Sequence, residues 1–598
     1  YHGRASSLVV SGQPVMRPQG QTQPTEGAPP VFGPSRLLDF DNLATVAILL
    51  VFGLFLLVPF ATILIVSFTG RPVAVLDALT GLEGVRRIGG EISANASLRY
   101  FEQLVTFPRY VRAFANSMSL GIMVAIASVL VAMPIAYALA RTRMPGRALI
   151  GALCIVPLMV PTFISSFAFI LMFGRTGWVN QIFAYVGIEQ LVDIHSPFGI
   201  GLVQVFFFFP YALLPMIAVF KAMDPVLEEA SHTLGARRPF AFLTTTMPVA
   251  APGIWAGLLL VLVVSLEDFG TPMILSPRGY PLMIVEAYRE MVGYFNWGGA
   301  AVIAVLLVLI SALLLLVQRW LLRHNQSRTQ GGKPATRERV GDPWVCRGLL
   351  VYSLLVLALP LMAIYTTALQ SFATSWGARM VPEGFTLENY RYVWDRSTGA
   401  VVNSFLLGGA ALAISVVMSA VIPYLVLRRG RRYLDYLGFL PLALPGTALA
   451  IALILTFNTP PVQIAGTAFL LIMAYVIRRM PYALRSTSAS IQTISTDIEG
   501  ASLVHGASKF LSLWSVTLPL MLPGIIAGGV MVFLTSIREI SATILLAPEG
   551  WKPMSLVIFE GLLRGEFYTS AAISMILIVV VMIVQIVVFR LMGDKSLF

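Results

Sequence analysis

Four charged side chains interrupt stretches of the sequence that are otherwise apolar, and they fall into two pairs. Glu267 and Asp268 form the first pair, and Arg538 and Glu539 form the second, in the other half of the chain. Charged residues inside a membrane segment are costly and usually face a cavity or a partner. Hard cations prefer carboxylate oxygens, so one interpretation is a cation passage with a net charge of −2 at these residues. The other interpretation is an ion pair between Arg538 and Glu267 or Asp268 that joins two helices.

Two short polar segments combine acidic residues, small residues and a glycine at the same spacing. Thr496 and Glu499 have the spacing of a capping box, which is typical of a helix start. Gly235 and Gly506 are suited to end a helix in the left-handed conformation. The sequence therefore predicts a short surface helix in each segment. The candidate functional residues are Glu228, Glu229, Ala230 and Gly235 in 224–248, and Glu499, Ala501 and Gly506 in 495–519.

The composition indicates an integral membrane protein. Of the 598 residues, 57% are hydrophobic and only 12% are charged, which is about half the charged fraction of a typical soluble domain. This composition excludes the possibility that the whole chain is a soluble enzyme, a disordered scaffold or a nucleic-acid-binding domain. Twelve apolar runs are long enough to cross a bilayer, which takes about 20 residues in a helix. They lie near 43–68, 116–140, 149–173, 198–222, 249–275, 300–322, 349–370, 403–427, 433–457, 464–484, 520–547 and 570–593.

The net charge of +12 is explained by the loops between these runs. Short basic loops follow every second run, which is the pattern of the positive-inside rule if residue 1 is cytoplasmic. Both termini are then expected in the cytoplasm, and no nucleic-acid partner is needed to explain the charge. In this interpretation Arg478 and Arg479 are basic anchors at the cytoplasmic end of the tenth run.

The sequence contains an internal duplication. Pro210-Tyr211-Ala212 recurs as Pro481-Tyr482-Ala483, and Asn116-Ser117 recurs as Asn403-Ser404. Each copy holds six runs, and because six is even, both copies enter the membrane from the same side as parallel repeats. The expected domains are a disordered cytoplasmic tail at 1–40, a first half at 41–323, a cytoplasmic linker at 324–343 and a second half at 344–598.

The two predicted surface helices resemble the Glu-Ala-Ala loops of binding-protein-dependent ABC importer permeases. Glu229-Ala230-Ser231 fits the first loop and Ala501-Ser502 fits the second, whereas Gly500 replaces the motif glutamate. Segments 265–270 and 537–543 are similar to the ferric-iron branch, in which two halves are fused. The resemblance covers nearly the whole chain. It implies an all-α integral membrane protein with about twelve transmembrane helices as two parallel six-helix repeats, the type I ABC importer permease fold.

The resemblance also implies partners. In this family the two loop helices dock on two copies of a cytoplasmic ATPase, and a short rigid helix transmits the closure of that dimer as rigid-body motion. The chain itself lacks a phosphate-binding loop, because Gly332-Lys333 is followed by Pro334. It is therefore expected to be no enzyme and to hold no cofactor, with ATP and Mg on the partner ATPase. An extracytoplasmic binding protein, the inner membrane of a bacterium and one fused chain per complex are further implications.

The expected function is ATP-driven import, with ferric iron as the favoured cargo. A polyamine, thiamine, a phosphonate or an oxyanion remains open within the family. The alternative from another class is an ion-coupled secondary transporter, which the paired loops disfavour. No residue is expected to be catalytic, and a metal site is not assigned, because His195, His232 and His505 stand alone.

Overall fold

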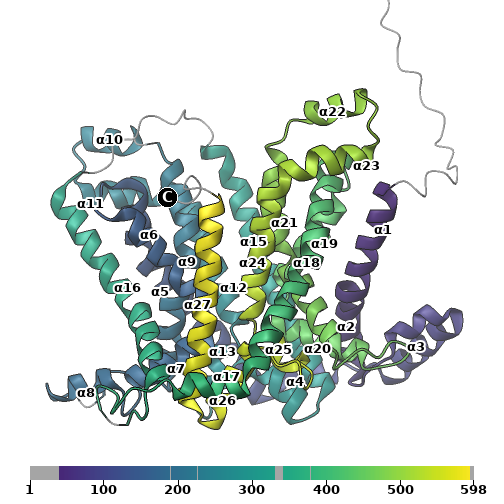
Figure 1. The fold of residues 1–598 in the computed structure, drawn as a ribbon, viewed down its shortest axis with the longest axis horizontal. Helices are drawn as coiled ribbons and strands as arrows, with labels where there is room; N and C mark the ends of the chain where they lie inside the picture. The colour runs from purple at the N-terminus through teal and green to yellow at the C-terminus, as the bar shows by residue number, and fades with distance from the viewer. Residues whose placement is uncertain (1–39, 189, 225, 330–340, 378, 593–598) are drawn as a thin grey trace, which may run out of the picture.

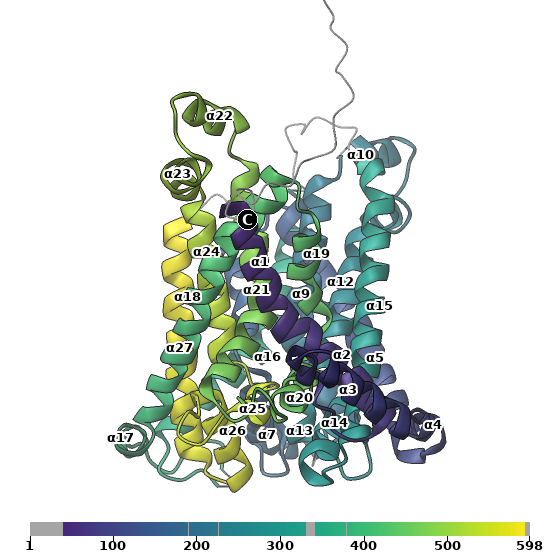
Figure 2. The ribbon, with the colours of Figure 1, turned by 90° about the vertical axis from the view of Figure 1, so that its right-hand side faces the viewer.

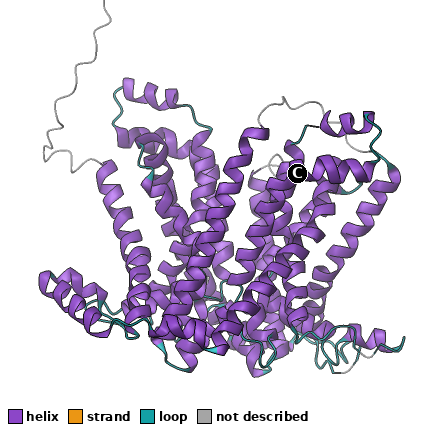
Figure 3. Ribbon diagram, turned by 180° about the vertical axis from the view of Figure 1, so that it is seen from behind, coloured by secondary structure: helices purple, strands orange, loops and turns teal. Residues whose placement is uncertain are grey.

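The structure is a computed structural model that describes residues 40–592 except 189, 225, 330–340 and 378. Within these residues the regular secondary structure is helical (Figure 3), and one isolated β-bridge joins Ala373 and Phe385. The expected tail lies outside the described residues apart from Phe40. The centre of the expected linker also lies outside them, and the helix before it runs through Thr329, beyond its predicted end.

The first half forms a bundle whose helices begin at recognisable caps. Ser196 caps the helix that starts at Pro197, because its hydroxyl accepts a hydrogen bond from Gly199 N at 3.0 Å. The elements are α1 (Phe40–Phe52), the π-helix η2 (Gly53–Leu57), α2 (Val58–Thr69), the 3-10 helix η3 (Val75–Thr80), α3 (Leu82–Asn95), α4 (Arg99–Thr106), α5 (Pro108–Arg141), α6 (Arg147–Ile155), the 3-10 helix η4 (Val156–Met159), α7 (Thr162–Phe173), α8 (Trp178–Ala184), α9 (Pro197–Ala222), α10 (Val226–Thr233), α11 (Arg238–Ala241), the π-helix η5 (Phe242–Thr246), α12 (Met247–Glu267), α13 (Gly270–Leu275), α14 (Met283–Tyr288), the π-helix η6 (Arg289–Gly293) and α15 (Trp297–Thr329).

The second half repeats this order closely, which agrees with the duplication in the sequence. Thr467 caps α21 as Ser196 caps α9, at the equivalent position of the repeat. From α5 and α18 onward, most elements recur in the same order, but α8 and the π-helix η6 have no counterpart among the described residues of the second half. The elements are α16 (Pro343–Phe372), α17 (Glu388–Arg396), α18 (Thr398–Arg429), α19 (Tyr433–Phe439), the 3-10 helix η7 (Leu440–Ala443), α20 (Gly446–Phe457), α21 (Ala468–Gln492), α22 (Thr496–Val504), α23 (Lys509–Ser512), the π-helix η8 (Leu513–Thr517), α24 (Leu518–Ile537), α25 (Thr543–Leu546), α26 (Met554–Arg564) and α27 (Phe567–Met592).

The twelve predicted crossings correspond to ten long apolar helices, one bent pair of helices and the more polar helix α21. Ten helices among the described residues are long and apolar enough to cross a membrane, and there are eleven if the pair bent by 107° around Leu444 and Pro445 is counted as one span. The tenth expected run corresponds to α21, whose arginines make it more polar than the others. The third expected run, 149–173, is broken at Pro161, between η4 and α7.

The two halves exchange their first helices. α16 of the second half packs against α5, α7 and α9 of the first half. Conversely, α1 packs against α18, and α2 packs against α20. Each half therefore completes the other, and their interface runs through the centre of the bundle.

The short helices α10 and α22 project from the same face of the molecule, which we call the loop-helix face (Figures 1 and 2). α1 begins and α27 ends near this face, whereas α4, α8 and α17 lie at the opposite face. The two halves are therefore oriented in parallel, as the even number of runs predicted.

Two long helices break near the opposite face at the charged pairs singled out in the sequence. α12 ends at Glu267 and the chain resumes a helix at Gly270, while α24 ends at Ile537 and the next helix begins at Thr543. The expected runs 249–275 and 520–547 are thus each divided between a long helix and a short one. The charged residues lie in the breaks, where the backbone no longer satisfies its own hydrogen bonds within a helix.

Candidate functional site: paired loop helices and a central cavity

The predicted loop helices are present, and each begins with a side-chain cap. Asp224 Oδ1 accepts a hydrogen bond from Val226 N at 3.0 Å at the start of α10. At the start of α22, Ser495 Oγ accepts from Asp497 N at 3.2 Å, so Ser495 is the N-cap. The predicted capping box of Thr496 and Glu499 is therefore wrong, because the Glu499 carboxylate turns toward the membrane helices instead.

Both loop helices end at the predicted glycines. Gly235 has φ of 86° and Gly506 has φ of 88°, which are left-handed conformations that glycine adopts without strain. Ala236 N donates to Ser231 O at 3.0 Å, and Ala507 N donates to Ser502 O at 3.1 Å. These bonds satisfy carbonyl groups at the helix end, as in a Schellman motif.

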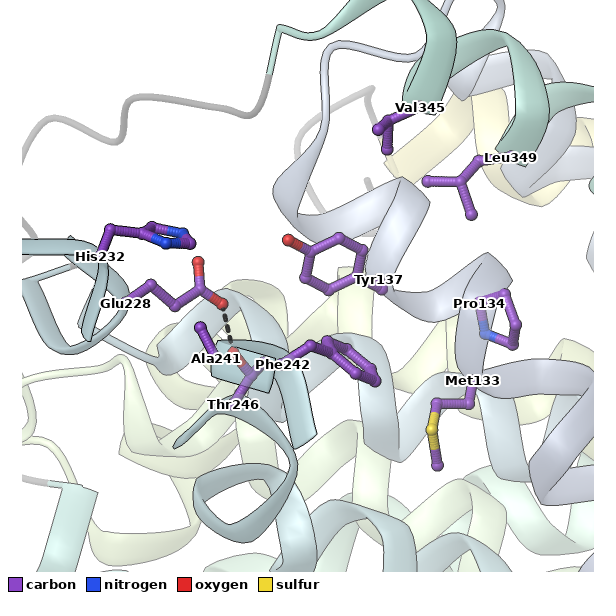
Figure 4. Close-up of a pocket in the computed structure, with 10 residues that line it drawn as sticks. All are labelled: Met133, Pro134, Tyr137, Glu228, His232, Ala241, Phe242, Thr246, Val345 and Leu349. Carbon is purple, nitrogen blue, oxygen red and sulfur yellow. Dashed lines mark hydrogen bonds between the residues drawn. The ribbon is translucent and has the colours of Figure 1, made fainter. Parts of the chain in front are cut away.

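The carboxylate of Glu228 fastens α10 to the membrane helices. It forms an ion pair with Arg141 Nη2 at 3.0 Å and accepts a hydrogen bond from Thr246 Oγ1 at 2.7 Å. Arg141 Nη1 also donates to Met223 O at 3.2 Å, at the end of α9. Figure 4 shows Glu228 directed at Thr246. One guanidinium thus joins the end of α5, the end of α9 and the loop helix.

The second half contains the same arrangement. Glu499 forms an ion pair with Arg428 Nε at 2.9 Å and accepts from Thr517 Oγ1 at 3.2 Å. Arg428 Nη2 donates to Ile494 O at 2.7 Å. We call these two sets the arginine clamps, and they consist of Arg141, Glu228 and Thr246 in the first half and Arg428, Glu499 and Thr517 in the second.

The remaining predicted residues of the loop helices face outward. Glu229, Ala230 and Ala501 are exposed, whereas Gly500 is partly buried. Apolar side chains accompany them, with Leu227 43% exposed and its counterpart Ile498 48% exposed. An exposed apolar side chain therefore stands at the equivalent position of each loop helix.

A pocket of about 310 Å³ lies behind the first loop helix (Figure 4). Glu228 and His232 line it from α10, and Tyr137 lines it from α5. Val345 and Leu349 reach it from α16, which belongs to the second half. The base of α10 is therefore a place where the two halves meet.

A second cavity, of about 170 Å³, lies at the breaks of the long helices, and we call it the central cavity. Its lining comes from both halves and contains all four predicted passage residues. It also contains two arginines of α21 that were expected at a helix end. The charged and hydroxyl-bearing aromatic residues of the lining are Glu267, Asp268, Arg478, Arg479, Arg538, Glu539, Tyr211 and Tyr482.

Glu539 is the centre of an ion network in this cavity. Arg478 Nη1 lies 2.6 Å from Glu539 Oε1, and Arg479 binds the other carboxylate oxygen. Arg478 Nη2 also lies 3.4 Å from Glu267 Oε2, which connects the second half to the first. The interpretation of Arg478 and Arg479 as anchors at a helix end is therefore wrong.

The predicted pairing of Arg538 with Glu267 or Asp268 is also wrong. Asp268 accepts hydrogen bonds from Thr162 Oγ1 at 2.7 Å and Gln204 Nε2 at 2.9 Å, so it is occupied within its own half. Arg478 takes the place beside Glu267 because α21 continues to Gln492 and carries its arginines into the cavity. The side chain of Arg538 makes no ion pair or hydrogen bond with the residues that the structure describes.

The duplication is chemically unequal in the cavity. Phe207 and Phe208 occupy the positions in the first half that Arg478 and Arg479 occupy in the second. Three arginines therefore face three carboxylates, and the cavity is neutral when all are ionised, rather than −2. The described residues also contain no group of three or more histidine, cysteine, aspartate or glutamate side chains that could hold a metal ion.

Aromatic contacts between the halves close the bundle beside the cavity. The ring of Phe559 on α26 lies 6.0 Å from that of Phe163 and 6.1 Å from that of Phe269. Phe167 stacks on Phe567 at 5.3 Å. These rings, which we call the aromatic seal, come from elements near the opposite face (Figure 1).

Sequence reasoning missed the arginine clamps, although a signal for them existed. Arg141 and Arg428 are related by the same offset that relates Asn116 to Asn403. Considered singly, each belongs to a basic loop. Comparison of the two copies residue by residue would have singled them out as a repeated pair of cations opposite Glu228 and Glu499.

Comparison with known proteins agrees with this geometry. The ferric transport system permease protein FbpB of Actinobacillus pleuropneumoniae is 28% identical over 81% of this chain and 72% of its own length. The Fe(3+)-transport system permease protein FbpB 2 of Haemophilus influenzae is 26% identical over 80% of this chain and 89% of its own. A Salmonella typhimurium protein named for 2-aminoethylphosphonate transport is 25% identical over 41% of this chain and 95% of its own.

The sequence profile of one family matches the chain twice, once in each half. The matched residues are 128–326 and 411–594, which include both loop helices, both arginine clamps and most of the central cavity. These matches cover well over half of the chain and exclude the alternative of an ion-coupled secondary transporter. The protein belongs to the family of binding-protein-dependent transport system inner membrane components, with two copies of the family's domain fused in one chain.

Proposed function

We propose that this chain is the membrane-spanning subunit of an importer that carries ferric iron into a bacterial cell. An extracytoplasmic binding protein delivers the iron at the opposite face, and the loop-helix face lies in the cytoplasm. Two copies of a separate ATPase bind ATP and Mg and dock on α10 and α22. One fused chain in the inner membrane supplies both docking helices, and it holds no cofactor of its own.

The observation that carries this proposal is the duplicated, clamped loop helix. Each helix exposes Leu227 or Ile498 to a partner while its own carboxylate is tied to the membrane helices. An ATPase that moves such a helix also moves the ends of two membrane helices, because the clamp arginine bonds to both. A flexible loop would absorb the same displacement.

Iron as the cargo is supported by the two ferric relatives, which match across both halves of the chain. The phosphonate relative matches over about the length of one half, so it supports the shared transport mechanism more than the cargo. Phosphonate import is nevertheless the second candidate, because the central cavity contains arginines that suit an oxyanion.

Docking of the ATPase can be tested with two substitutions and a matched control. Leu227→Glu and Ile498→Glu place a charge on the two exposed loop-helix surfaces, and we expect the double variant to lose ATPase association in a pull-down. Leu387→Glu changes an equally apolar residue, 62% exposed, at the opposite face and should leave association intact. Full association of the double variant would contradict the docking proposal.

The cargo can be tested in proteoliposomes that contain the chain, its ATPase and its binding protein. We expect ATP-dependent uptake of radioactive ferric iron and no ATP-dependent uptake of 2-aminoethylphosphonate. Uptake of the phosphonate alone would replace iron with the second candidate, and uptake without ATP would contradict the whole proposal.

A further inference from the structure

The central cavity contains hydrogen-bond donors that the protein itself does not use. Arg538 lines the cavity without an ion pair to any described residue, and the hydroxyl groups of Tyr211 and Tyr482 make no hydrogen bond to the described residues either. Arg479 Nε is buried and lacks a partner among them. Arginine and tyrosine hydroxyls are donors that match anionic oxygen. Arg538 is partly buried and its guanidinium has no counter-ion among the described residues, so an anion in the cavity would supply the missing charge partner.

The acceptors in the cavity are mostly occupied. Glu539 is bound by two arginines, and Asp268 is bound by Thr162 and Gln204. The one exception is Glu267, whose buried Oε1 has no hydrogen-bond partner among the described residues. A bare trivalent cation would therefore meet one free carboxylate oxygen and the unpaired Arg538, which would repel it.

We propose that the central cavity binds a carboxylate- or phosphate-type oxyanion on Arg538, Tyr211 and Tyr482, and that the metal cargo crosses as a complex with this anion. The oxyanion takes the unused donors, and the metal end of the complex faces the free oxygen of Glu267. The identity of the metal rests on the proposed function, whereas the binding of the anion does not.

The two tyrosines strengthen this assignment because they are related by the duplication. Tyr211 and Tyr482 occupy equivalent positions of the two copies and line the same cavity from α9 and α21. Arg538, by contrast, has Glu267 as its counterpart in the first half. The cavity lining thus combines an equivalent pair of hydroxyl donors, a cation and a free carboxylate oxygen, which suits a ligand with an anionic end and a metal end.

The test is binding of citrate to the full chain with its ATPase in lipid nanodiscs, measured by calorimetry without iron. We expect saturable binding that is at least about tenfold weaker in Arg538→Gln, because a hydrogen bond to a charged group contributes that much or more. Arg538→Lys keeps the charge but loses the planar pair of donors. Its affinity for citrate should therefore lie between that of the unmodified chain and that of Arg538→Gln. Arg564→Gln, at an exposed arginine paired with Glu560, is the matched control and should bind as the unmodified chain does.

A double variant provides an independent test in case Arg538→Gln does not fold. Tyr211→Phe with Tyr482→Phe removes only two hydroxyl groups, and we expect citrate binding to weaken about fivefold or more. Absence of saturable citrate binding in the unmodified chain would overturn the proposal. Equal binding by the unmodified chain, Arg538→Gln and the tyrosine double variant would overturn it as well, and so would a loss in Arg564→Gln as large as that in Arg538→Gln.

A second arm replaces citrate with ferric citrate. We expect ferric citrate to bind at least as tightly as citrate, and Glu267→Gln to remove any advantage of the ferric complex. If citrate binds and ferric citrate does not, the part of the proposal that concerns the complex is wrong. Iron uptake in proteoliposomes is a separate measurement, so failure of the proposed function and failure of this inference are distinguishable.

Discussion

Arg478 on α21 and Glu267 on α12 form an ion pair at 3.4 Å that joins the second half of the chain to the first inside the central cavity. Both side chains are largely buried. The other ion pairs of this cavity among the described residues lie within the second half, between Glu539 and the two arginines of α21. Movement of one half against the other must therefore stretch or break the pair between Arg478 and Glu267.

Glu267→Gln should loosen this connection. Removal of one partner from a buried pair costs about 3–5 kcal/mol, and the loss here should be smaller, because Arg478 keeps Glu539 as a counter-ion. We expect ATP hydrolysis in the absence of the binding protein to rise several-fold in proteoliposomes. Arg564→Gln disrupts an exposed pair worth about 0–1 kcal/mol and serves as the control. Unchanged basal hydrolysis in Glu267→Gln would show that the pair does not hold the resting state.

The arginine clamps should control coupling rather than assembly. Arg141→Ala or Arg428→Ala leaves a partly buried glutamate without its counter-ion and frees the loop helix from the end of α9 or α21. We expect the ATPase to remain bound while the amount of cargo moved per ATP falls several-fold. Arg143→Ala, at an exposed neighbour of Arg141, is the matched control.

Exchange of the charges provides a stricter test of the same clamp. The double variant Arg141→Glu with Glu228→Arg restores an ion pair, although it loses the bond to Met223 O. Transport per ATP should recover in part relative to either single variant. A double variant that behaves as the sum of the two single variants would show that the contact has no role in coupling.

The glycines of α22 and its end allow a comparison within one loop. Gly506 has a positive φ, whereas Gly500 lies inside α22, and an added Cβ would meet no atom within 4 Å at either position. Gly506→Ala should cost about 1–2 kcal/mol of backbone strain and lower coupled transport. Gly500→Ala should gain up to about 1 kcal/mol of helix stability. Limited proteolysis of the loop and transport per ATP would measure both, and equal behaviour of the two variants would contradict the assigned conformation.

The aromatic seal should keep the opposite face closed at rest. Phe559 is fully buried against Phe163 and Phe269, and truncation of such a ring to alanine costs about 3–5 kcal/mol. Phe559→Ala should therefore favour opening and make a cysteine introduced at Tyr211 more reactive toward a reagent added from the side of the binding protein. Phe405→Ala, at a ring 42% exposed that packs within the second half, is the control.

Features encoded by local pattern were predictable from the sequence. The duplication, the parallel halves, the loop helices and the left-handed Gly235 and Gly506 follow from spacing and residue type, and the structure agrees with each of them. The cap of α22 lies one position before the predicted one, because Ser495 and Thr496 are adjacent hydroxyl residues and local sequence does not distinguish them.

Features that depend on distant contacts were not predictable in the same way. Hydropathy ends the tenth run at 484 and places Arg478 and Arg479 at its cytoplasmic end, but α21 continues to Gln492. Both arginines tolerate a buried position because Glu539, far away in the sequence, neutralises them. A hydropathy scale sums the contributions of single residues, so it contains no information on a counter-ion that is distant in the sequence.

The unequal charges of the two halves in the central cavity make it important that one copy of each half is assembled together. Two first halves paired together would bring Glu267 and Asp268 against their own copies with no arginine between them, and two second halves would face each other with arginines in threefold excess over glutamate. Neither product has a balanced interior. Because one gene product contains one copy of each half, synthesis on a single ribosome fixes the stoichiometry and leaves no free halves to mispair in the membrane.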